Sequence, residues 1–195
     1  MKQNGWPTKP LGEIAVFKSG STPSKSNSGY WGGDTPWVSA KDLKSFVISD
    51  SILKLTDSGK SVAKMAPENS LLILVRGMTL HKDIPISVAG REVAFNQDIK
   101  ALIVSEGIEP NYLMYYMLSQ KDKILQLVDS AGHGTGRLNT DSLKNFPILM
   151  PPMNEQKRFV EILSTAQREI DLIEQKLELL KKQKRGLMQK LFTVE

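Results

Sequence analysis

The segment after Pro151-Pro152 carries the pattern that most constrains the fold of this chain. No proline follows Pro152, and apolar residues alternate with charged ones up to Phe192. Steps of alternating four and three residues connect ten positions, nine of them apolar, which are Phe159, Leu163, Ala166, Ile170, Ile173, Leu177, Leu180, Lys184, Leu187 and Leu191. This heptad repeat predicts one long helix with a seam that pairs with another helix.

The ends and the length of this predicted helix fit the same interpretation. Asn154 is a candidate N-cap, Glu155 lies near the positive end of the helix dipole, and a basic cluster from Lys181 to Lys190 lies near its negative end. At about 1.5 Å per residue the helix would be roughly 57 Å long, which exceeds what a small domain covers. We therefore expect the seam, with Lys184 as its one polar member, to form a dimer interface rather than to pack back on its own domain.

The preceding residues read as strands and turns. Short apolar runs lie between glycine, proline and serine clusters, which is typical of a β-rich or mixed domain. The expected strands are Gly12 to Lys18, Trp37 to Ser39, Ser70 to Arg76, Ile84 to Val88, Val93 to Phe95 and Ile99 to Val104. An amphipathic helix is expected over Asn111 to Val128, with Pro110 in its first turn. The predicted fold is α+β, with a globular domain over residues 1–153 followed by a long coiled-coil helix over residues 154–195.

Composition excludes several classes of chemistry. The chain has no cysteine, so no disulfide framework, thiolate metal site or cysteine nucleophile is expected. His81 and His133 have no partner at metal-ligand spacing, and the run from Gly132 to Arg137 lacks the lysine and serine of a phosphate-binding loop. We expect no catalytic residue, no metal and no cofactor. The net charge of +5 favours a polyanionic partner such as nucleic acid.

Two features of the sequence bear on localisation. The first five residues are polar, and the apolar run from Leu71 to Val75 is too short to span a bilayer. We expect a soluble cytoplasmic protein without a membrane partner.

Taken together, the motifs resemble the specificity subunits of type I restriction-modification systems. The resemblance covers nearly the whole chain and is carried by Trp6 with Leu11-Gly12-Glu13-Ile14, Gly20 to Ser24, Tyr30 to Gly33 with Pro36-Trp37, Asn96 to Leu102, Pro151 to Lys157, and Lys184 to Phe192. It implies a non-catalytic subunit that supplies DNA recognition to a methyltransferase and to an ATP-dependent restriction and translocase subunit.

The resemblance also bears on assembly. Family members usually carry two recognition domains and two long helices, whereas this chain has one of each and no internal repeat. It resembles a half subunit, so a homodimer reading a bipartite, palindromic double-stranded DNA target is expected. A fragment that awaits its missing half is the other possibility.

Readout of DNA needs polar and cationic side chains on loops of a rigid scaffold. The candidates are Thr22, Ser24, Lys25, Ser39, Lys41, Arg76, His81, Lys82, Arg91, Asn96, Thr135 and Arg137. The aromatic residues Tyr30, Trp31 and Trp37 are expected to pack in the domain rather than to stack on an extruded base. The alternative function is a coiled-coil interaction module or adaptor that binds proteins without reading DNA.

Overall fold

The computed structural model describes residues 5–131 and 134–192 of the chain. The chain divides into two compact units, Met1–Gln156 and Lys157–Glu195. The division lies three residues beyond the boundary expected between residues 153 and 154, within the long helix. The first unit carries the described strands and the hydrophobic core, and the described residues of the second, 157–192, are helical.

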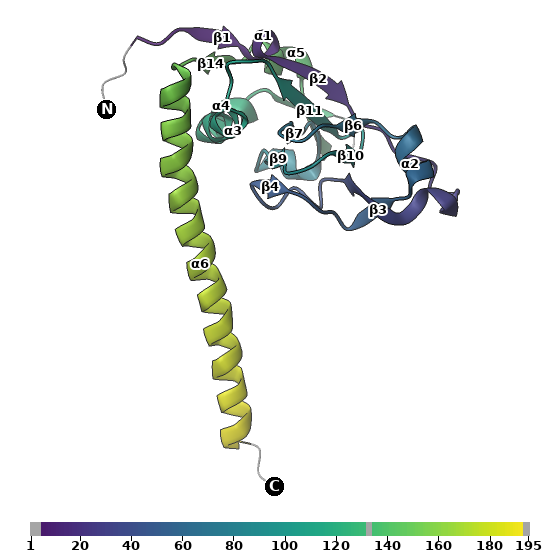
Figure 1. The fold of residues 1–195 in the computed structure, drawn as a ribbon, viewed down its shortest axis with the longest axis vertical. Helices are drawn as coiled ribbons and strands as arrows, with labels where there is room; N and C mark the ends of the chain where they lie inside the picture. Colours follow the sequence, from purple (N-terminus) through teal and green to yellow (C-terminus); the bar gives the residue numbers. More distant parts are fainter. Residues whose placement is uncertain (1–4, 132–133, 193–195) are drawn as a thin grey trace. The chain divides into compact units, whose positions relative to one another are not determined.

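A five-stranded sheet forms the centre of the first unit (Figure 1). Its strand order is β2 (Ala15–Ser19), β11 (Ile99–Val104), β7 (Leu71–Leu74), β9 (Ile86–Ala89) and β4 (Val47–Ile48). The sequence of β7 is Leu-Leu-Ile-Leu, and all four residues are buried, as expected for a strand covered on both faces. All its pairings are antiparallel except that of β4 with β9, which is parallel. Strand β11 has the predicted bounds.

The second sheet has four strands. Its order is β5 (Leu53–Leu55), β3 (Trp31–Val38), β10 (Val93–Phe95) and β6 (Met65–Ala66). Strand β10 has the predicted bounds, whereas the expected strand from Trp37 is much longer and begins at Trp31. Its glycines and proline are typical of turns, but Gly32 and Gly33 fall in a register shift between Trp31 and Thr35, and Pro36 pairs in register with Lys54.

Two smaller sheets complete the described strands. One pairs β1 (Thr8–Pro10) with β14 (Pro147–Leu149), and the other has the order β12 (Val128–Ala131), β13 (Thr135–Leu138) and β8 (Arg76–Gly77). The strand expected to run through Arg76 therefore ends at Leu74 in one sheet, and Arg76 belongs to another. Tertiary pairing with β13 causes this break, which apolar periodicity could not reveal.

Short helices connect the strands. They are α1 (Leu11–Ile14), η1 (Ser28–Tyr30), α2 (Asp57–Val62), η2 (Met78–His81), α3 (Pro110–Ser119), α4 (Lys121–Leu125) and α5 (Thr140–Lys144). The strand expected from Gly12 was wrong in its first half, because Leu11–Ile14 forms a helical turn that buries Leu11 and Ile14. The expected helix over Asn111 to Val128 is interrupted at Gln120, and Val128 already belongs to β12. Pro110 lies in the first turn of α3, as predicted.

The long C-terminal helix α6 spans Met153–Phe192 as one unbroken element (Figure 1). Its first turn differs from the prediction. The carbonyl of Pro152 accepts hydrogen bonds from the N–H groups of Glu155 and Gln156 at 2.9 and 3.1 Å, so the helix begins before Asn154 and Asn154 is not its N-cap. Mixed sheets with one long helix confirm the α+β fold class.

Candidate nucleic-acid interface

The pairing of β8 with β13 brings together two arginines that are distant in sequence. Arg76 lies directly opposite Arg137, and Gly77 lies opposite Gly136. Both arginines are exposed, and neither guanidinium makes a hydrogen bond or ion pair within the described part of the chain. Asp129 of β12 is the other cross-strand neighbour of Arg137.

Gly136 permits the short helix η2 to approach this sheet. A Cβ atom at Gly136 would lie 2.8 Å from the Cβ of Leu80, which is closer than carbon atoms can pack. The neighbouring His81 bonds the carbonyl of Gly134 through its Nε2 at 2.7 Å. Because a carbonyl only accepts, this ring nitrogen carries the hydrogen, and His81 ties η2 to the start of β13. Residues 132 and 133, which belong to the predicted glycine loop, lie outside the described residues.

Three of the predicted contact residues lie on one face of this sheet, which we call the arginine face: Arg76, Arg137 and Thr135. His81 and Lys82 belong to η2, which packs against the opposite face at Gly136. Lys82 is exposed at the end of η2, while the adjacent Asp83 forms an ion pair with Lys121. Two permanent cations side by side on adjacent strands, Arg76 and Arg137, are suited to phosphate oxygens or guanine edges.

A second group of predicted residues lies on the loop after β2. Thr22 donates a hydrogen bond to the side-chain carbonyl of Gln97 at 2.7 Å, and the hydroxyls of Ser24 and Ser26 are 2.8 Å apart. Gly20 is needed here, because a Cβ atom would lie 2.1 Å from the carbonyl oxygen of Asn96. Lys25 is exposed at the tip of this loop. Sequence reasoning missed Gln97, because the contact joins residues 75 positions apart.

Trp31 and Trp37 both donate hydrogen bonds to this loop. The indole N–H of Trp31 donates to the carbonyl of Ser24 at 3.1 Å, and that of Trp37 donates to the carbonyl of Ser21 at 3.0 Å. The two rings meet edge to face with centroids 5.2 Å apart, and Trp37 is only 5% exposed. The geometry favours packing over stacking on a base, since each indole already satisfies its donor within the domain.

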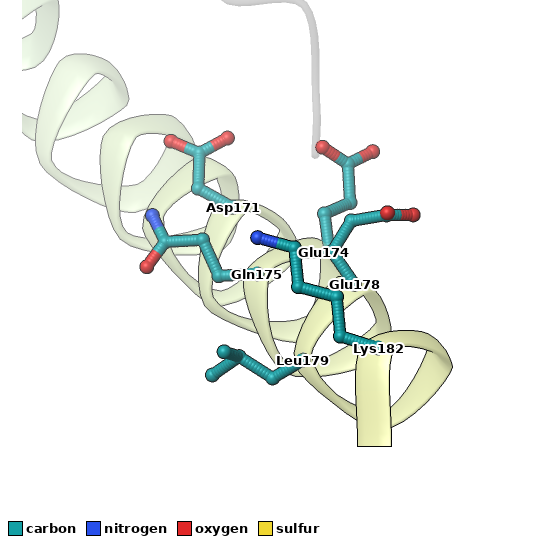
Figure 2. A pocket seen from close by; sticks show the side chains of 6 residues that line it. All are labelled: Asp171, Glu174, Gln175, Glu178, Leu179 and Lys182. Atoms are coloured by element: carbon teal, nitrogen blue, oxygen red, sulfur yellow. The ribbon is translucent and has the colours of Figure 1, made fainter. Parts of the chain in front are cut away.

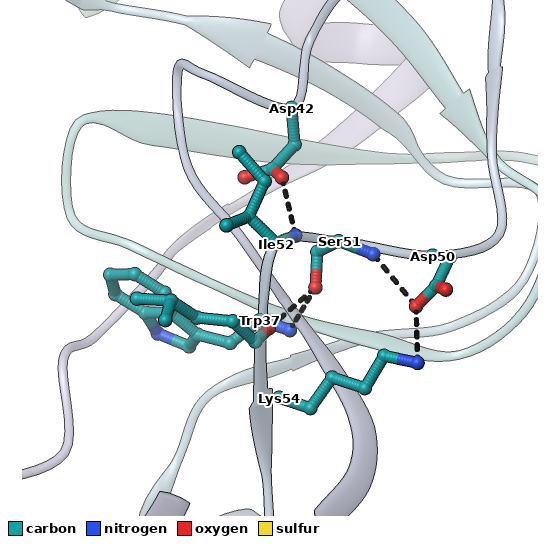
Figure 3. A network of polar contacts seen from close by, with 7 residues as sticks. Trp37, Asp42, Asp50, Ser51, Ile52 and Lys54 are labelled. Carbon is teal, nitrogen blue, oxygen red and sulfur yellow. Dashed lines mark hydrogen bonds and ion pairs between the residues drawn. The ribbon is translucent and has the colours of Figure 1, made fainter. Parts of the chain in front are cut away.

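A third loop presents Ser39 and Lys41 and is organised by Asp42. One carboxylate oxygen of Asp42 accepts from the backbone N–H and the hydroxyl of Ser39, each at 2.8 Å, and the other accepts from the N–H of Ile52 at 2.8 Å. Figure 3 shows the bond from Ile52 to Asp42 beside the bond from the backbone N–H of Trp37 to the hydroxyl of Ser51. Lys41 remains exposed. The spacing of Ser39 and Asp42 is the local signal that could have identified Asp42.

The same network includes a charge pair at the surface. The ammonium of Lys54 lies 3.0 Å from Asp50, whose carboxylate also accepts the N–H of Ser51. The hydrogen bond from Lys54, followed by that from Ser51, lowers the pKa of Asp50 below its ordinary value. Asp50 therefore stays ionised and supports the strand that carries Lys54.

The last two predicted DNA-contact residues, Arg91 and Asn96, differ in their exposure to solvent. Arg91 is exposed between β9 and β10, next to Glu92, which pairs with Lys60. Asn96 is only 8% exposed, and both ends of its amide bond to Asp98, at 3.1 and 3.2 Å. Its side chain therefore stabilises the turn between β10 and β11. The structure gives Asn96 an internal role and leaves Arg91 at the surface.

The predicted seam lies along α6. Its leucine and isoleucine side chains from Leu163 to Leu191 are between 43% and 77% exposed, and Phe159 is partly buried. Ala166 and Lys184 are exposed. Outside the seam, Figure 2 shows the charged face of the same helix, where Asp171, Glu174 and Glu178 accompany Lys182. A 40-residue helix with so many exposed large apolar side chains is typical of a partner-binding element.

No metal centre or membrane span is found in residues 5–131 and 134–192. They contain no group of three His, Asp or Glu side chains arranged to hold a metal ion. None of their helices combines the length and the apolar character needed to cross a bilayer.

The fold is an α+β domain with exposed cations on its loops and strands, continued by one long helix that carries an exposed apolar seam. A family model for the type I restriction modification DNA specificity domain matches residues 3–182. The chain belongs to this family. It is therefore classed with the specificity components of type I restriction-modification systems and not with the catalytic ones.

Individual relatives agree with this assignment. The chain is 35% identical over 158 residues to the type I restriction enzyme EcoR124I/EcoR124II specificity subunit of Escherichia coli, with 80% of this chain and 39% of the relative covered. It is 32% identical to the MjaIX specificity subunit of Methanocaldococcus jannaschii, with 88% and 39% covered. The chain thus spans about two fifths of the length of these relatives.

Solved structures share the fold at lower identity. One, described as showing complex assembly and conformational transition of the type I R-M system, matches 97% of this chain and 45% of its own with a TM-score of 0.72 at 20% identity. The HsdS subunit from Thermoanaerobacter tengcongensis matches 90% of this chain and 40% of its own with a TM-score of 0.65 at 20% identity. At 20% identity, these two similarities show that the fold is shared.

Proposed function

We propose that this chain supplies DNA sequence recognition to a methyltransferase subunit and a restriction and translocase subunit. It acts in the cytoplasm as a homodimer joined through α6 and reads a bipartite double-stranded target. Residues 1–153 form the recognition domain, and residues 154–195 form the pairing helix. The match of the specificity family over residues 3–182 carries the proposal, because it includes the arginine face and the first seven residues of the seam, from Phe159 to Leu180.

The charge and placement of exposed groups support DNA as the ligand. The arginine face presents two guanidiniums on adjacent strands, and loops carrying Lys25, Lys41 and Arg91 present further cations. Arginine donates two parallel hydrogen bonds to the edge of guanine or to a phosphate, so paired arginines suit either contact. The small sheet that holds them is anchored to the domain through Gly136 and Leu80.

The composition of α6 supports protein partners. The seam offers one apolar stripe to a second copy, and a second stripe of Ile162, Leu172 and Leu179 lies outside it, each more than half exposed. A helix pair formed through the seam would still expose this second stripe. We assign it to contact with the methyltransferase subunit, since apolar surface left on a paired helix is a docking surface.

Salt dependence of DNA binding tests the recognition role. Binding of the dimer with its methyltransferase to a mixed-sequence duplex should weaken steeply as salt rises, because each phosphate contact releases counterions. An adaptor without DNA recognition would show no binding at low salt. Failure to bind at 50 mM salt, with the complex intact by light scattering, would contradict the proposal.

A further inference from the structure

One short turn between β10 and β11 joins segments that carry predicted DNA-contact residues. It spans residues 96–99 and is closed by a hydrogen bond from the N–H of Ile99 to the carbonyl of Asn96 at 3.3 Å. The buried side-chain amide of Asn96 bonds Asp98 twice, once at its carboxylate and once at its N–H. Gln97, at the second position of the turn, is exposed. The turn is therefore fixed from within the domain and presents Gln97 to solvent.

Two further strands are bonded to this turn. The N–H of Asn96 donates to the carbonyl of Val38, at the end of β3, at 3.0 Å. The carbonyl of Asp98 accepts from the N–H groups of Val75 and Arg76, at 2.8 and 3.3 Å. The turn that carries Gln97 is thus bonded directly to the backbone of Arg76, on the arginine face.

The loop after β2 brings Thr22 to the same turn. The N–H of Ser21 donates to the carbonyl of Phe95 at 2.9 Å, and the carbonyl of Ser21 accepts from the indole of Trp37 at 3.0 Å. Gly20 permits this approach, because any Cβ atom there would overlap the backbone of the turn. Thr22 is therefore placed by contacts that precede it along the chain.

The contact of Thr22 with Gln97 leaves a defined set of donors at the surface. The Thr22 hydroxyl donates to the side-chain carbonyl of Gln97 at 2.7 Å, and both residues are exposed. This bond orients the amide, whose nitrogen keeps two hydrogens that no acceptor within residues 5–131 and 134–192 takes up. The guanidinium of Arg76 also offers only donors. Phosphate oxygens only accept, so they complement both groups.

We propose that Gln97, oriented by Thr22, donates hydrogen bonds to a phosphate of the DNA backbone. The inference rests on the proposed function, which supplies DNA as the ligand, and adds a contact that is independent of base sequence. Phosphate contacts fix the register of a protein on the duplex without selecting a base. Because the turn is bonded to the backbone of Arg76, the contact at Gln97 also fixes where the arginine face meets the duplex.

Gln97→Leu tests this contact, because leucine has a similar size and lacks both donors. The dimer assembled with its methyltransferase subunit should bind about five- to tenfold more weakly. The loss should be equal for a mixed-sequence duplex and for a duplex carrying a site identified from methylated positions in host DNA. The salt dependence of binding should not change, because no charge is removed. Gln126→Leu, at an exposed position at the end of α4, is the matched control and should bind as the wild type does.

The hydroxyl of Thr22 should act only through Gln97. Thr22→Val should cause part of the same loss, Thr22→Ser should cause none, and adding Thr22→Val to Gln97→Leu should weaken binding no further. Unchanged binding of Gln97→Leu would overturn the inference. A loss confined to the methylated site would also overturn it, because Gln97 would then read a base. A wild-type complex that binds neither duplex at low salt would overturn the proposed function as well.

Discussion

The side chain of Gln156 accepts a hydrogen bond from the backbone N–H of Glu109 at 2.9 Å and is 1% exposed. Its amide nitrogen donates to the carbonyls of Gly107 at 3.1 Å and Pro151 at 2.9 Å. Gln156 therefore joins the first turn of α6 to the loop before α3. A buried glutamine that makes all three of these hydrogen bonds fixes the two segments to each other.

Replacing Gln156 tests how much these three hydrogen bonds stabilise the domain. Gln156→Ala should lower the free energy of unfolding by about 2–4 kcal/mol, because it leaves buried backbone groups without partners. Denaturant unfolding monitored by circular dichroism measures the change. Gln126→Ala, at an exposed position, is the control and should change stability by less than about 0.5 kcal/mol. Equal stabilities of the two variants would show that water replaces the hydrogen bonds of Gln156.

The arginine face should contribute to DNA binding without contributing to stability. Arg76→Ala and Arg137→Ala should each weaken binding of the assembled complex by about 1–3 kcal/mol, with little change in melting temperature. Fluorescence anisotropy over a salt series measures both the affinity and its salt dependence. Lys123→Ala, an exposed position on α4, is the control. Unchanged binding of both arginine variants would remove this face from the DNA interface.

The seam should determine assembly independently of the recognition domain. Leu177→Glu with Leu180→Glu should dissociate the homodimer, because two buried charges on each helix would have no partner. Light scattering measures the mass, and circular dichroism should show a folded domain. Leu172→Glu, outside the seam, should leave the homodimer intact. A seam variant that stays dimeric would mean that another surface holds the two chains together.

Tyr112 links the stability of the domain to alkaline pH. Its hydroxyl donates to the carbonyl of Leu149 at 2.8 Å, and burial, with a smaller effect of Tyr116, raises its pKa above the ordinary value. Because the folded pKa is raised, the contribution of Tyr112 is fully present below the unfolded pKa of about 10 and is lost as the pH rises above it.

Tyr112→Phe should therefore be less stable than the wild type by about 1 kcal/mol at pH 8. The difference should narrow above pH 10, because the phenylalanine variant has no hydroxyl to ionise. Urea unfolding at pH 8, 9.5 and 10.5 measures it. A difference that grows with pH would contradict the raised pKa.

Local patterns in the sequence were enough to predict several helices and strands of this protein. The heptad repeat predicted the start of α6 to within one residue, and the bounds of β10 and β11 were predicted correctly from short apolar runs bordered by turns. The order of the family's motifs indicated the specificity family, which the family model confirms. Such features are local because helix periodicity and strand alternation repeat within a few residues.

Only the tertiary structure decided which polar side chains share a surface. Arg76 meets Arg137 because β8 leaves the central sheet to pair with β13, and Asn96 is taken inside the domain by the turn that contains Asp98. Helical packing around Leu11 likewise overrode the strand expected at Gly12. These outcomes depend on contacts between residues far apart in sequence, whose free energy comes from burial and register across the whole domain and leaves no local periodicity to read.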